Sequence, residues 1–365
     1  MSVNPAPPAN GQKQAAVPPV PFRKAALYKS TLMGSFALSA TLADRVNTEI
    51  DSKGYMATLR LFVSGSETTS TADPGASADF PWALFRRLEL RDTAGGLLYS
   101  CKGYSAYIAE RFFHPYSGRN LDGVSDVRVY TVSISAVQAN TIAFSVGIHV
   151  EAGTRDNLGL VPNQNASFKY TLTTEVAPEA DIVTTPANAA WALSVQPAYD
   201  YYSVPAPMRA DGRPQATMPP FAGVVRQQQD TTIPIPSTAE QRLALTVGRV
   251  YRGIVLITRN SSHVRVNGLS RLKLKFGDDN LLFDFTEQDL LERAYRLWGI
   301  ATIPTGVYPL TFAADNDMYV GADFRRDLID TRRISQIYFE YTPQNSTAEV
   351  DLLTDHAIVP SAMSL

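Results

Sequence analysis

The sequence predicts an all-β protein made of two similar domains in tandem. Apolar and polar residues alternate along much of the chain after residue 34, which is the period of strands with one buried face. A strand–turn–strand–helix pattern occurs twice, and a proline-rich segment separates the two copies. Together these observations indicate a duplicated β domain.

The two hairpins align at one constant offset without a gap. The aligned positions are Arg87-Leu88 with Arg271-Leu272, and Leu97-Leu98 with Leu281-Leu282. Both turns contain Gly, Asn or Asp residues, which tolerate the backbone angles of a hairpin. Duplication explains this likeness, and the alternative is a chance similarity of two unrelated hairpins.

A helix is expected after each hairpin. After the second, Thr286 and Asp289 form a capping box, and Gly299 supplies the C-terminal stop. The apolar face of this helix consists of Leu290, Leu291, Ala294, Leu297 and Trp298. After the first, Tyr104, Tyr107, Ile108 and Phe112 have a similar spacing, and Pro115 ends the run.

The remaining strands follow in order. In the first half they are expected at 36–42, 56–63, 141–150, 168–176 and 191–195. In the second half they are expected at 243–247, 254–258, 307–312, 334–341 and 348–353. Many strands with one short helix in each half indicate a sandwich or jelly roll rather than an α/β fold.

Charge and composition narrow the class of protein. The chain of 365 residues has a net charge of −2, which argues against a general nucleic-acid binder. Cys101 is the only cysteine, so internal disulfides and cysteine-based zinc sites are excluded. No apolar run has the length of a membrane span, and the N-terminus lacks the apolar segment of a secretory signal. We expect a soluble product made in a reducing compartment.

The composition divides the chain into four segments. We expect a flexible N-terminal arm at 1–22, a first domain at 23–204, a proline-rich linker at 205–237 and a second domain at 238–365. The arm is rich in Pro, Ala, Asn and Gln and has little to bury. The seven prolines of the linker remove amide donors, so we expect no regular element there.

The N-terminal region is basic. Its first 43 residues contain four basic residues and no acidic one, which leaves a net charge of −6 for the rest of the chain. The candidate residues for contact with an inner surface or a membrane are Lys13, Arg23, Lys24 and Lys29. The alternative is a disordered tail whose charge has no function.

The sequence carries no pattern of a catalytic, cofactor or metal site. It contains no nucleophile elbow, phosphate-binding loop or dinucleotide fingerprint. The four histidines are scattered, and His149 is expected to be a hydrogen-bonded structural residue within a strand. Asp315-Asn-Asp317 begins like a calcium loop, but Tyr319 and Gly321 break the required pattern. We therefore expect no catalytic residues, no cofactor and no metal.

The segment 81–92, the Gly-Gly turn after it and Gly103-Tyr104 at the start of the next helix resemble a known family. It comprises the double jelly-roll major capsid proteins of tailless, icosahedral bacterial viruses that enclose a lipid membrane, the tectivirus-like lineage. The resemblance implies two tandem eight-stranded jelly rolls, with short helices after corresponding hairpins. It covers nearly the whole chain beyond the arm, although the loops at 64–78 and 120–126 have no counterpart in the family.

The resemblance also implies a function. It implies a structural protein, not an enzyme, that forms pseudo-hexagonal homotrimers and joins neighbouring trimers in an icosahedral virus shell. The chain would be made in the host cytoplasm and located in the virion. Minor capsid or vertex proteins and an internal lipid membrane are the other implied partners, with no sequence-specific nucleic acid.

Two alternatives remain at this point. A viral spike, or another carbohydrate- or receptor-binding β protein, would carry aromatic residues clustered on one exposed face. A sugar-modifying jelly-roll enzyme would carry a buried pair of carboxylates in a cleft.

Overall fold

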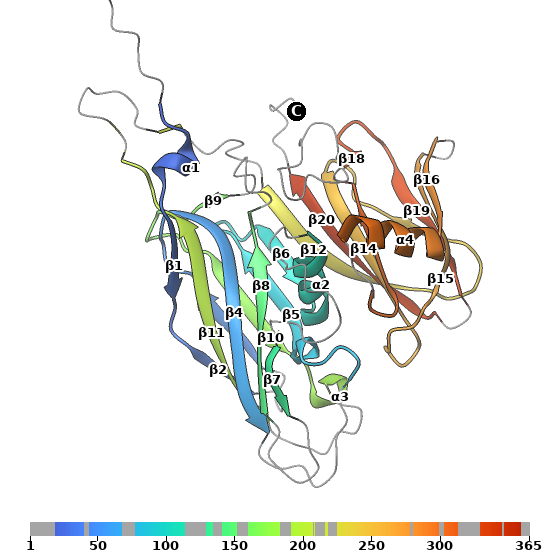
Figure 1. Ribbon diagram of the computed structural model, residues 1–365, viewed down its shortest axis with the longest axis horizontal. Coiled ribbons are helices and arrows are strands. Elements are labelled where there is room, and N and C mark those ends of the chain that lie inside the picture. Colours follow the sequence, from blue (N-terminus) through green and yellow to red (C-terminus); the bar gives the residue numbers. More distant parts are fainter. Residues whose placement is uncertain are drawn as a thin grey trace, which may run out of the picture.

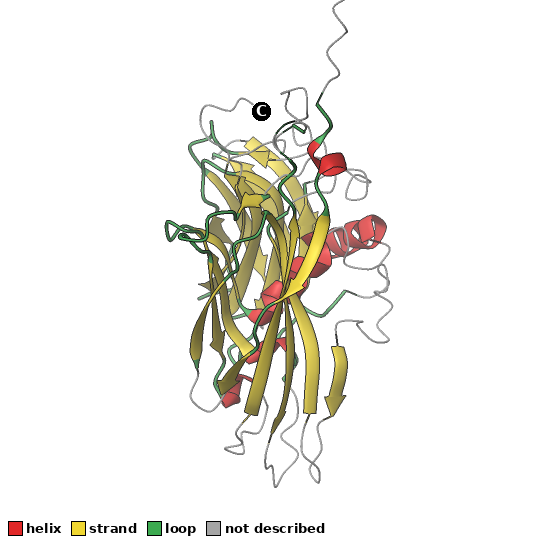
Figure 2. Cartoon of the chain, turned by 90° about the vertical axis from the view of Figure 1, so that its left-hand side faces the viewer, coloured by secondary structure: helices red, strands yellow, loops and turns green. Residues whose placement is uncertain are grey.

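A computed structural model gives the arrangement of the chain. It describes residues 19–39, 44–67, 77–113, 129–133, 141–151, 160–182, 191–206, 208, 216–217, 225–277, 280–298, 303–312, 329–344 and 347–358. Strands make up the body of the molecule, and the few helices lie among and beside them (Figure 2).

The first half of the chain forms a barrel of eight principal strands, called the first barrel. They are β1 (Tyr28–Leu32), β3 (Arg45–Glu49), β4 (Tyr55–Glu67), β5 (Phe85–Arg91), β6 (Leu97–Cys101), β8 (Thr141–His149), β10 (Thr171–Val176) and β11 (Trp191–Tyr202). One sheet has the strand order β1-β11-β4-β8, and the facing sheet has the order β3-β10-β5-β6. Three short strands extend the first sheet: β2 (Phe36–Ser39), β7 (Val129–Ser133) and β9 (Val161–Pro162).

The second half repeats this arrangement in the second barrel. Its strands are β12 (Val225–Pro234), β13 (Gln241–Ala244), β14 (Val250–Arg259), β15 (Leu269–Phe276), β16 (Asn280–Thr286), β17 (Val307–Thr311), β19 (Ile337–Pro343) and β20 (Glu349–Ile358). The sheets have the orders β12-β20-β14-β17 and β13-β19-β15-β16, and the short β18 (Ile329–Asp330) pairs with β14.

Both barrels therefore connect their strands in the same way. In each, the first, eighth, third and sixth principal strands make one sheet, and the second, seventh, fourth and fifth make the other. This is the eight-stranded jelly roll. The predicted all-β double jelly roll is confirmed.

A single sheet runs through both barrels. β6 of the first barrel pairs in parallel with β12 of the second, at Tyr99 opposite Gln228 and Ser100 opposite Gln229. The sheet with β6 and the sheet with β12 consequently form one nine-stranded sheet. The two barrels lie side by side in Figure 1, with this junction between them.

The prediction that 205–237 contains no regular element is wrong, because β12 occupies residues 225–234 of it. Five of the seven prolines precede this strand, Pro234 ends it and Pro236 follows it. The amide donors inside the strand are therefore intact, and β12 pairs along its whole length with β20. Among the described residues, the linker thus supplies the first strand of the second barrel.

The duplicated hairpins and the helices after them form as predicted. Helix α2 (Gly103–Phe113) follows the first hairpin, and α4 (Glu287–Trp298) follows the second. The Thr286 amide donates to Asp289 Oδ2 at 2.9 Å, and the Asp289 amide donates to Thr286 Oγ1 at 3.3 Å, which confirms the capping box. Two further helices are short: α1 (Phe22–Ala25) and α3 (Glu179–Ile182). The predicted stops at Pro115 and Gly299 lie outside the described residues.

Some strand boundaries differ from the expectations. The strand expected at 243–247 is β13, which ends at Ala244, and the strand expected at 191–195 continues in β11 to Tyr202. β1, β3 and β7 were not predicted. β1 and β3 are mostly exposed edge strands, so their sequences lack the apolar alternation that marks a buried face.

The predicted arm extends too far, because its last residue belongs to the fold. Phe22 is buried with Tyr55 and Tyr202, and its ring lies 5.1 Å from that of Tyr55. Val20 forms a bridge with Ala216. Among the described residues of 1–22, the chain is already packed against the first barrel.

Each barrel has its own apolar core, and the duplicated hairpins occupy equivalent places in them. Leu88 lies in the core of the first barrel at 0% exposure, and Leu272 lies in the core of the second at 1%. The first core also takes in Val255, Ile257 and Leu353 from the second barrel. The two barrels are thus joined by apolar packing as well as by a shared sheet.

Leu88→Asp and Leu272→Asp are each expected to give insoluble protein. A carboxylate buried in an apolar core costs several kcal/mol, which is comparable to the whole stability of a domain. Sedimentation of the expressed protein measures the outcome. Val264→Asp, at an exposed position, is the control that stays soluble, and soluble Leu88→Asp protein would contradict the equivalence of the two sites.

Candidate functional site

The junction between the barrels contains a cluster of buried charged side chains. We call it the interbarrel joint and define it by Asp79, Arg87 and Lys102 of the first barrel and Arg226, Asp230, Arg259, Arg265, Asp351 and Asp355 of the second. Its apolar floor is the sheet of β14 and β20, whose two faces are both buried. Ile254 and Leu256 enter the second core, whereas Val255 and Ile257 enter the first.

Helix α2 lies between the barrels (Figure 1) and is buried on nearly all sides. Trp82 stacks on Tyr107 of this helix at 3.6 Å between ring centroids. Phe113, at its end, lies so close to β14 that a Cβ atom at Gly253 would meet its ring at 2.5 Å. Glycine at 253 therefore permits the helix to approach the second barrel.

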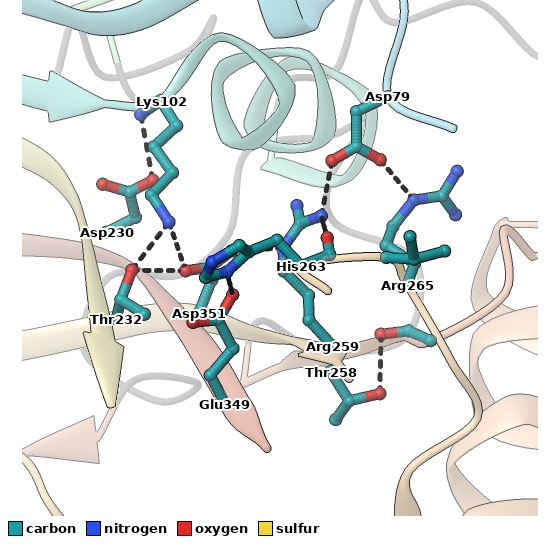
Figure 3. Close-up of polar contacts among 12 residues, drawn as sticks. Asp79, Lys102, Asp230, Thr232, Thr258, Arg259, His263, Arg265, Glu349 and Asp351 are labelled. Carbon is teal, nitrogen blue, oxygen red and sulfur yellow. Dashed lines mark hydrogen bonds and ion pairs between the residues drawn. The ribbon is translucent and has the colours of Figure 1, made fainter. Parts of the chain in front are cut away.

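Asp351 is the centre of the joint (Figure 3) and is fully buried. Lys102 Nζ of the first barrel lies 2.7 Å from Asp351 Oδ1, and Arg259 Nε lies 2.8 Å from Oδ2. The Thr232 hydroxyl donates to Oδ1 at 2.5 Å. One carboxylate of β20 thus connects a cation from each barrel.

Asp79 makes the reverse connection, from the first barrel to two arginines of the second (Figure 3). Its Oδ2 lies 2.6 Å from Arg259 Nη1, and its Oδ1 accepts from Arg265 Nε at 2.5 Å. The Arg265 guanidinium also lies over the ring of Tyr104, 4.6 Å from the centroid. Arg259 consequently links Asp79 and Asp351 in one chain of alternating charges.

Asp230 of β12 contacts the first barrel next to the paired residues of β6 and β12. It forms an ion pair with Arg87, and its Oδ2 accepts from the Lys102 amide at 2.9 Å. Both donors belong to the duplicated hairpin unit of the first barrel. The hairpin is therefore bound to the second barrel by main chain and side chain together.

Arg226 is the most deeply buried cation of the joint, at 2% exposure. It forms two parallel hydrogen bonds to Asp355, at 2.8 and 2.9 Å. It also donates to the carbonyl oxygens of His149 and Glu151 in the first barrel, at 3.2 and 2.7 Å. Arg252 Nη1 lies 2.9 Å from Asp355 Oδ2 and completes the cluster.

Asp351, Asp355 and Arg252 stay ionised at neutral pH. Burial alone would raise the pKa of Asp351, but Arg259 and Lys102 hold it below its usual value. Arg226 and Arg252 do the same for the pKa of Asp355 against its burial. Burial lowers the pKa of Arg252 to about 10, still well above neutrality. Because every one of these charges has a partner, removing one leaves another buried and uncompensated.

A neutral histidine lies beside the joint. His356 of β20 is fully buried, contacts Arg249 through Nε2 and lies 5.5 Å from the ring of Tyr251. Burial and then the Arg249 charge lower its pKa to about 3. His149, predicted to be structural, is buried and hydrogen-bonded to Thr58 Oγ1 at 3.1 Å.

The predicted contact residues do not lie in this joint. Lys13 is outside the described residues, and Arg23 is in α1 with its side chain undescribed. Lys24 and Lys29 are exposed at the start of the first barrel. Sequence reasoning did not predict the joint. The available signals were the unbroken apolar run at 254–257 and the acidic residues within the apolar strand 349–358.

The described residues include no group of three or more His, Cys, Asp or Glu side chains placed to hold a metal ion. The Asp315–Asp317 segment, which begins like a calcium loop without completing the pattern, lies outside the described residues. Among the helices that the structure describes, none has the length and apolarity to cross a membrane.

No protein-family model and no curated protein matches this sequence. Solved structures match its fold. The MCP of STIV, the Sulfolobus Turreted Icosahedral Virus, is 16% identical with a TM-score of 0.68 over 92% of this chain and 100% of its own. A chain of the PBCV-1 virus capsid is 11% identical, with a TM-score of 0.62 over 93% and 98%. The major capsid protein from Bacteriophage PM2 is 12% identical, with a TM-score of 0.51 over 93% and 100%.

Asp351→Asn is expected to lower the free energy of unfolding by about 3–5 kcal/mol, because Lys102 and Arg259 then lose their shared counter-charge in a buried site. Urea denaturation measures the loss. Asp330→Asn, which removes an exposed pair with Arg332, is the matched control and should cost less than about 1 kcal/mol. Equal losses in the two variants would contradict the importance of the joint.

The free energy of unfolding is expected to decrease as the pH is lowered, because His356 is buried in its neutral form. The folded-state pKa of about 3 lies below the ordinary value of about 6.5. Between those values the unfolded chain binds a proton that the folded chain does not, so acidification favours unfolding by up to about 5 kcal/mol. Urea unfolding at pH 7, 5.5 and 4.5 should show this slope, and His356→Gln should flatten it. An unchanged slope in the variant would contradict the assignment.

Proposed function

We propose that this chain is a major capsid protein that builds the shell of an icosahedral virus. The observation that carries the proposal is the pair of jelly rolls locked side by side by a buried charged joint. Three solved structures with the same fold over more than nine-tenths of this chain bear capsid names, and this likeness supports the proposal. The chain would act in the virion as a structural protein.

The architecture suits a building block of a flat facet. Two similar barrels in one chain, repeated about a threefold axis, give six similar barrels in a ring. Such a trimer is nearly hexagonal and tiles a plane. The tiling requires a fixed angle between the two barrels, and the interbarrel joint supplies the rigidity.

The alternatives receive less support from the described residues. The exposed aromatic residues Tyr28 of β1, Phe168 in the loop before β10 and Tyr295 of α4 come from three separate parts of the fold, whereas a sugar-binding surface would gather them on one face. The buried carboxylates Asp351 and Asp355 are held by arginine and lysine partners. A catalytic carboxylate pair would face a cleft instead.

We place the N-terminal arm on the inner side of the shell. Its basic residues would contact neighbouring trimers or anionic lipid headgroups, and each basic residue near such a lipid surface contributes roughly 1 kcal/mol. The attraction is weak for one chain, and many copies acting together make it effective. Since Phe22 is buried in the first barrel, the separable part of the arm ends before that residue.

The purified chain is expected to be a trimer with a mass three times 39.9 kDa. Multi-angle light scattering at micromolar concentration measures the mass, and electron microscopy should show nearly hexagonal particles. Reducing agent should leave the mass unchanged, because Cys101 is fully buried. A strictly monomeric protein would overturn the capsid proposal.

Deleting residues 1–18 is expected to leave the melting temperature and the trimer unchanged while shell formation is lost or becomes irregular. Deleting residues 1–24 should lower the melting temperature as well, because it removes the buried Phe22 ring. Calorimetry and electron microscopy separate the two effects. Normal shells from the shorter deletion would contradict the role of the arm.

A further inference from the structure

Because the two barrels have the same topology, each strand of one barrel corresponds to a strand of the other, residue by residue. β11 skips one residue of β4 next to Asp200, and β20 skips one residue of β14 next to Asp355, so these bulges are equivalent. Asp200 lies opposite Ser30 of β1, and Asp355 lies opposite Gln228 of β12. Ser30 therefore corresponds to Gln228. The aligned hairpins make Tyr99 of β6 correspond to Phe283 of β16.

The contact of the first barrel with the second is made inside the chain. β6 of the first barrel pairs in parallel with β12 of the second, with Tyr99 opposite Gln228. This contact buries both strands: Tyr99 is 1% exposed and Gln228 is 3% exposed. The joint described above surrounds it.

In the opposite direction, the corresponding strands β16 and β1 each have one edge that pairs with no described strand. β16 is the last strand of its sheet, and β1 is the last strand of its own. Their outer main-chain groups are ready to pair with another strand. The side chains that correspond to buried residues are exposed here, with Leu282 at 41%, Tyr28 at 56% and Leu32 at 61%.

Exposed apolar residues concentrate on these two edges. The described residues include twelve large apolar side chains that are exposed. Six of them belong to β1, to the residue before it, to β16 or to α4: Leu27, Tyr28, Leu32, Leu281, Leu282 and Tyr295. Tyr295 corresponds to Arg111 of α2, which is buried between the barrels at 8% exposure. The second barrel therefore exposes a surface whose counterpart on the first barrel is covered by the second barrel.

We propose that β16 of one protomer pairs in parallel with β1 of the next protomer, as β6 pairs with β12 inside the chain. The proposal rests on the trimer of the proposed function and names its interface. The register is taken from the β6–β12 pairing inside the chain. Phe283 then lies opposite Ser30 of the neighbour, and Asp284 lies opposite Thr31. The occupant of each free edge is thus a second copy of this chain.

The chemistry of the two contacts differs in a way that suits their roles. Leu32 of β1 corresponds to Asp230 of β12, which pairs with Arg87. Tyr28 of β1 corresponds to the buried Arg226 of β12. The contact inside the chain uses paired charges, whereas the contact between chains uses apolar side chains. Apolar surface drives association of folded protomers without the desolvation cost of buried ions.

The positions of the two edges allow a closed ring. β1 lies at the left end of the molecule in Figure 1 and β16 lies at the right end, with the joint between them. A contact between unlike ends is head-to-tail, and it closes when the rotation per protomer divides a full turn. Three protomers then give six barrel-to-barrel contacts, three within chains and three between chains, all with the same pairing of strands.

Engineered disulfides test the register in the full chain. Neighbouring strands lie about 4.8 Å apart, within the range that a disulfide bridges. Thr31→Cys combined with Asp284→Cys, treated with the oxidant diamide, should form covalent trimers on a non-reducing gel. The matched control, Thr31→Cys with Leu281→Cys, puts the second thiol three residues further along β16, beyond the reach of a disulfide, so it should not cross-link. Each single variant should also stay uncross-linked, because Cys101 is buried.

Light scattering of the same samples before oxidation separates the possible failures. Trimers that cross-link in the matched pair and not in the control support the strand pairing. Trimers without cross-links in Thr31→Cys/Asp284→Cys overturn the pairing and leave the trimer of the proposed function intact. A monomeric wild-type protein overturns both.

Discussion

The buried charge network between the barrels is the interaction on which the rest of the structure depends. Asp351 and Asp355 lie in β20, at full burial, and each is paired with two cations. Apolar packing alone would allow the barrels to slide, because it has no direction. Paired charges at fixed distances select one arrangement, since any shift leaves a buried charge without its partner. The joint therefore sets the angle between the two barrels.

Duplication followed by divergence explains how one fold serves two kinds of contact. The two hairpins and the helices after them occupy equivalent places, yet α2 is buried on nearly all sides whereas α4 is largely exposed. The difference lies in what covers each helix. The second barrel covers α2, whereas no barrel among the described residues covers α4 in the same way.

A rigid pair of barrels with unlike free ends is suited to assembly. Inside the protomer, paired charges fix the contact between the two barrels. The exposed strands β1 and β16 offer the surfaces for a similar contact between protomers. A large β building block avoids open edges by pairing them in the assembly. The proposed ring would do this at every edge of this kind with a single type of contact.

Patterns within short stretches of sequence were enough to predict the all-β class, the duplicated hairpins, the helix cap at Thr286 and the core positions Leu88 and Leu272. These features depend on short-range periodicity and on turn and cap chemistry, which are written in neighbouring residues. Only the tertiary structure decided that β12 arises from the proline-rich segment, that Phe22 belongs to the fold and that the charges form a joint. Arg259 and Asp79 are distant in the chain, and their pairing depends on where two barrels meet. No local pattern encodes a contact between side chains that the fold alone brings together.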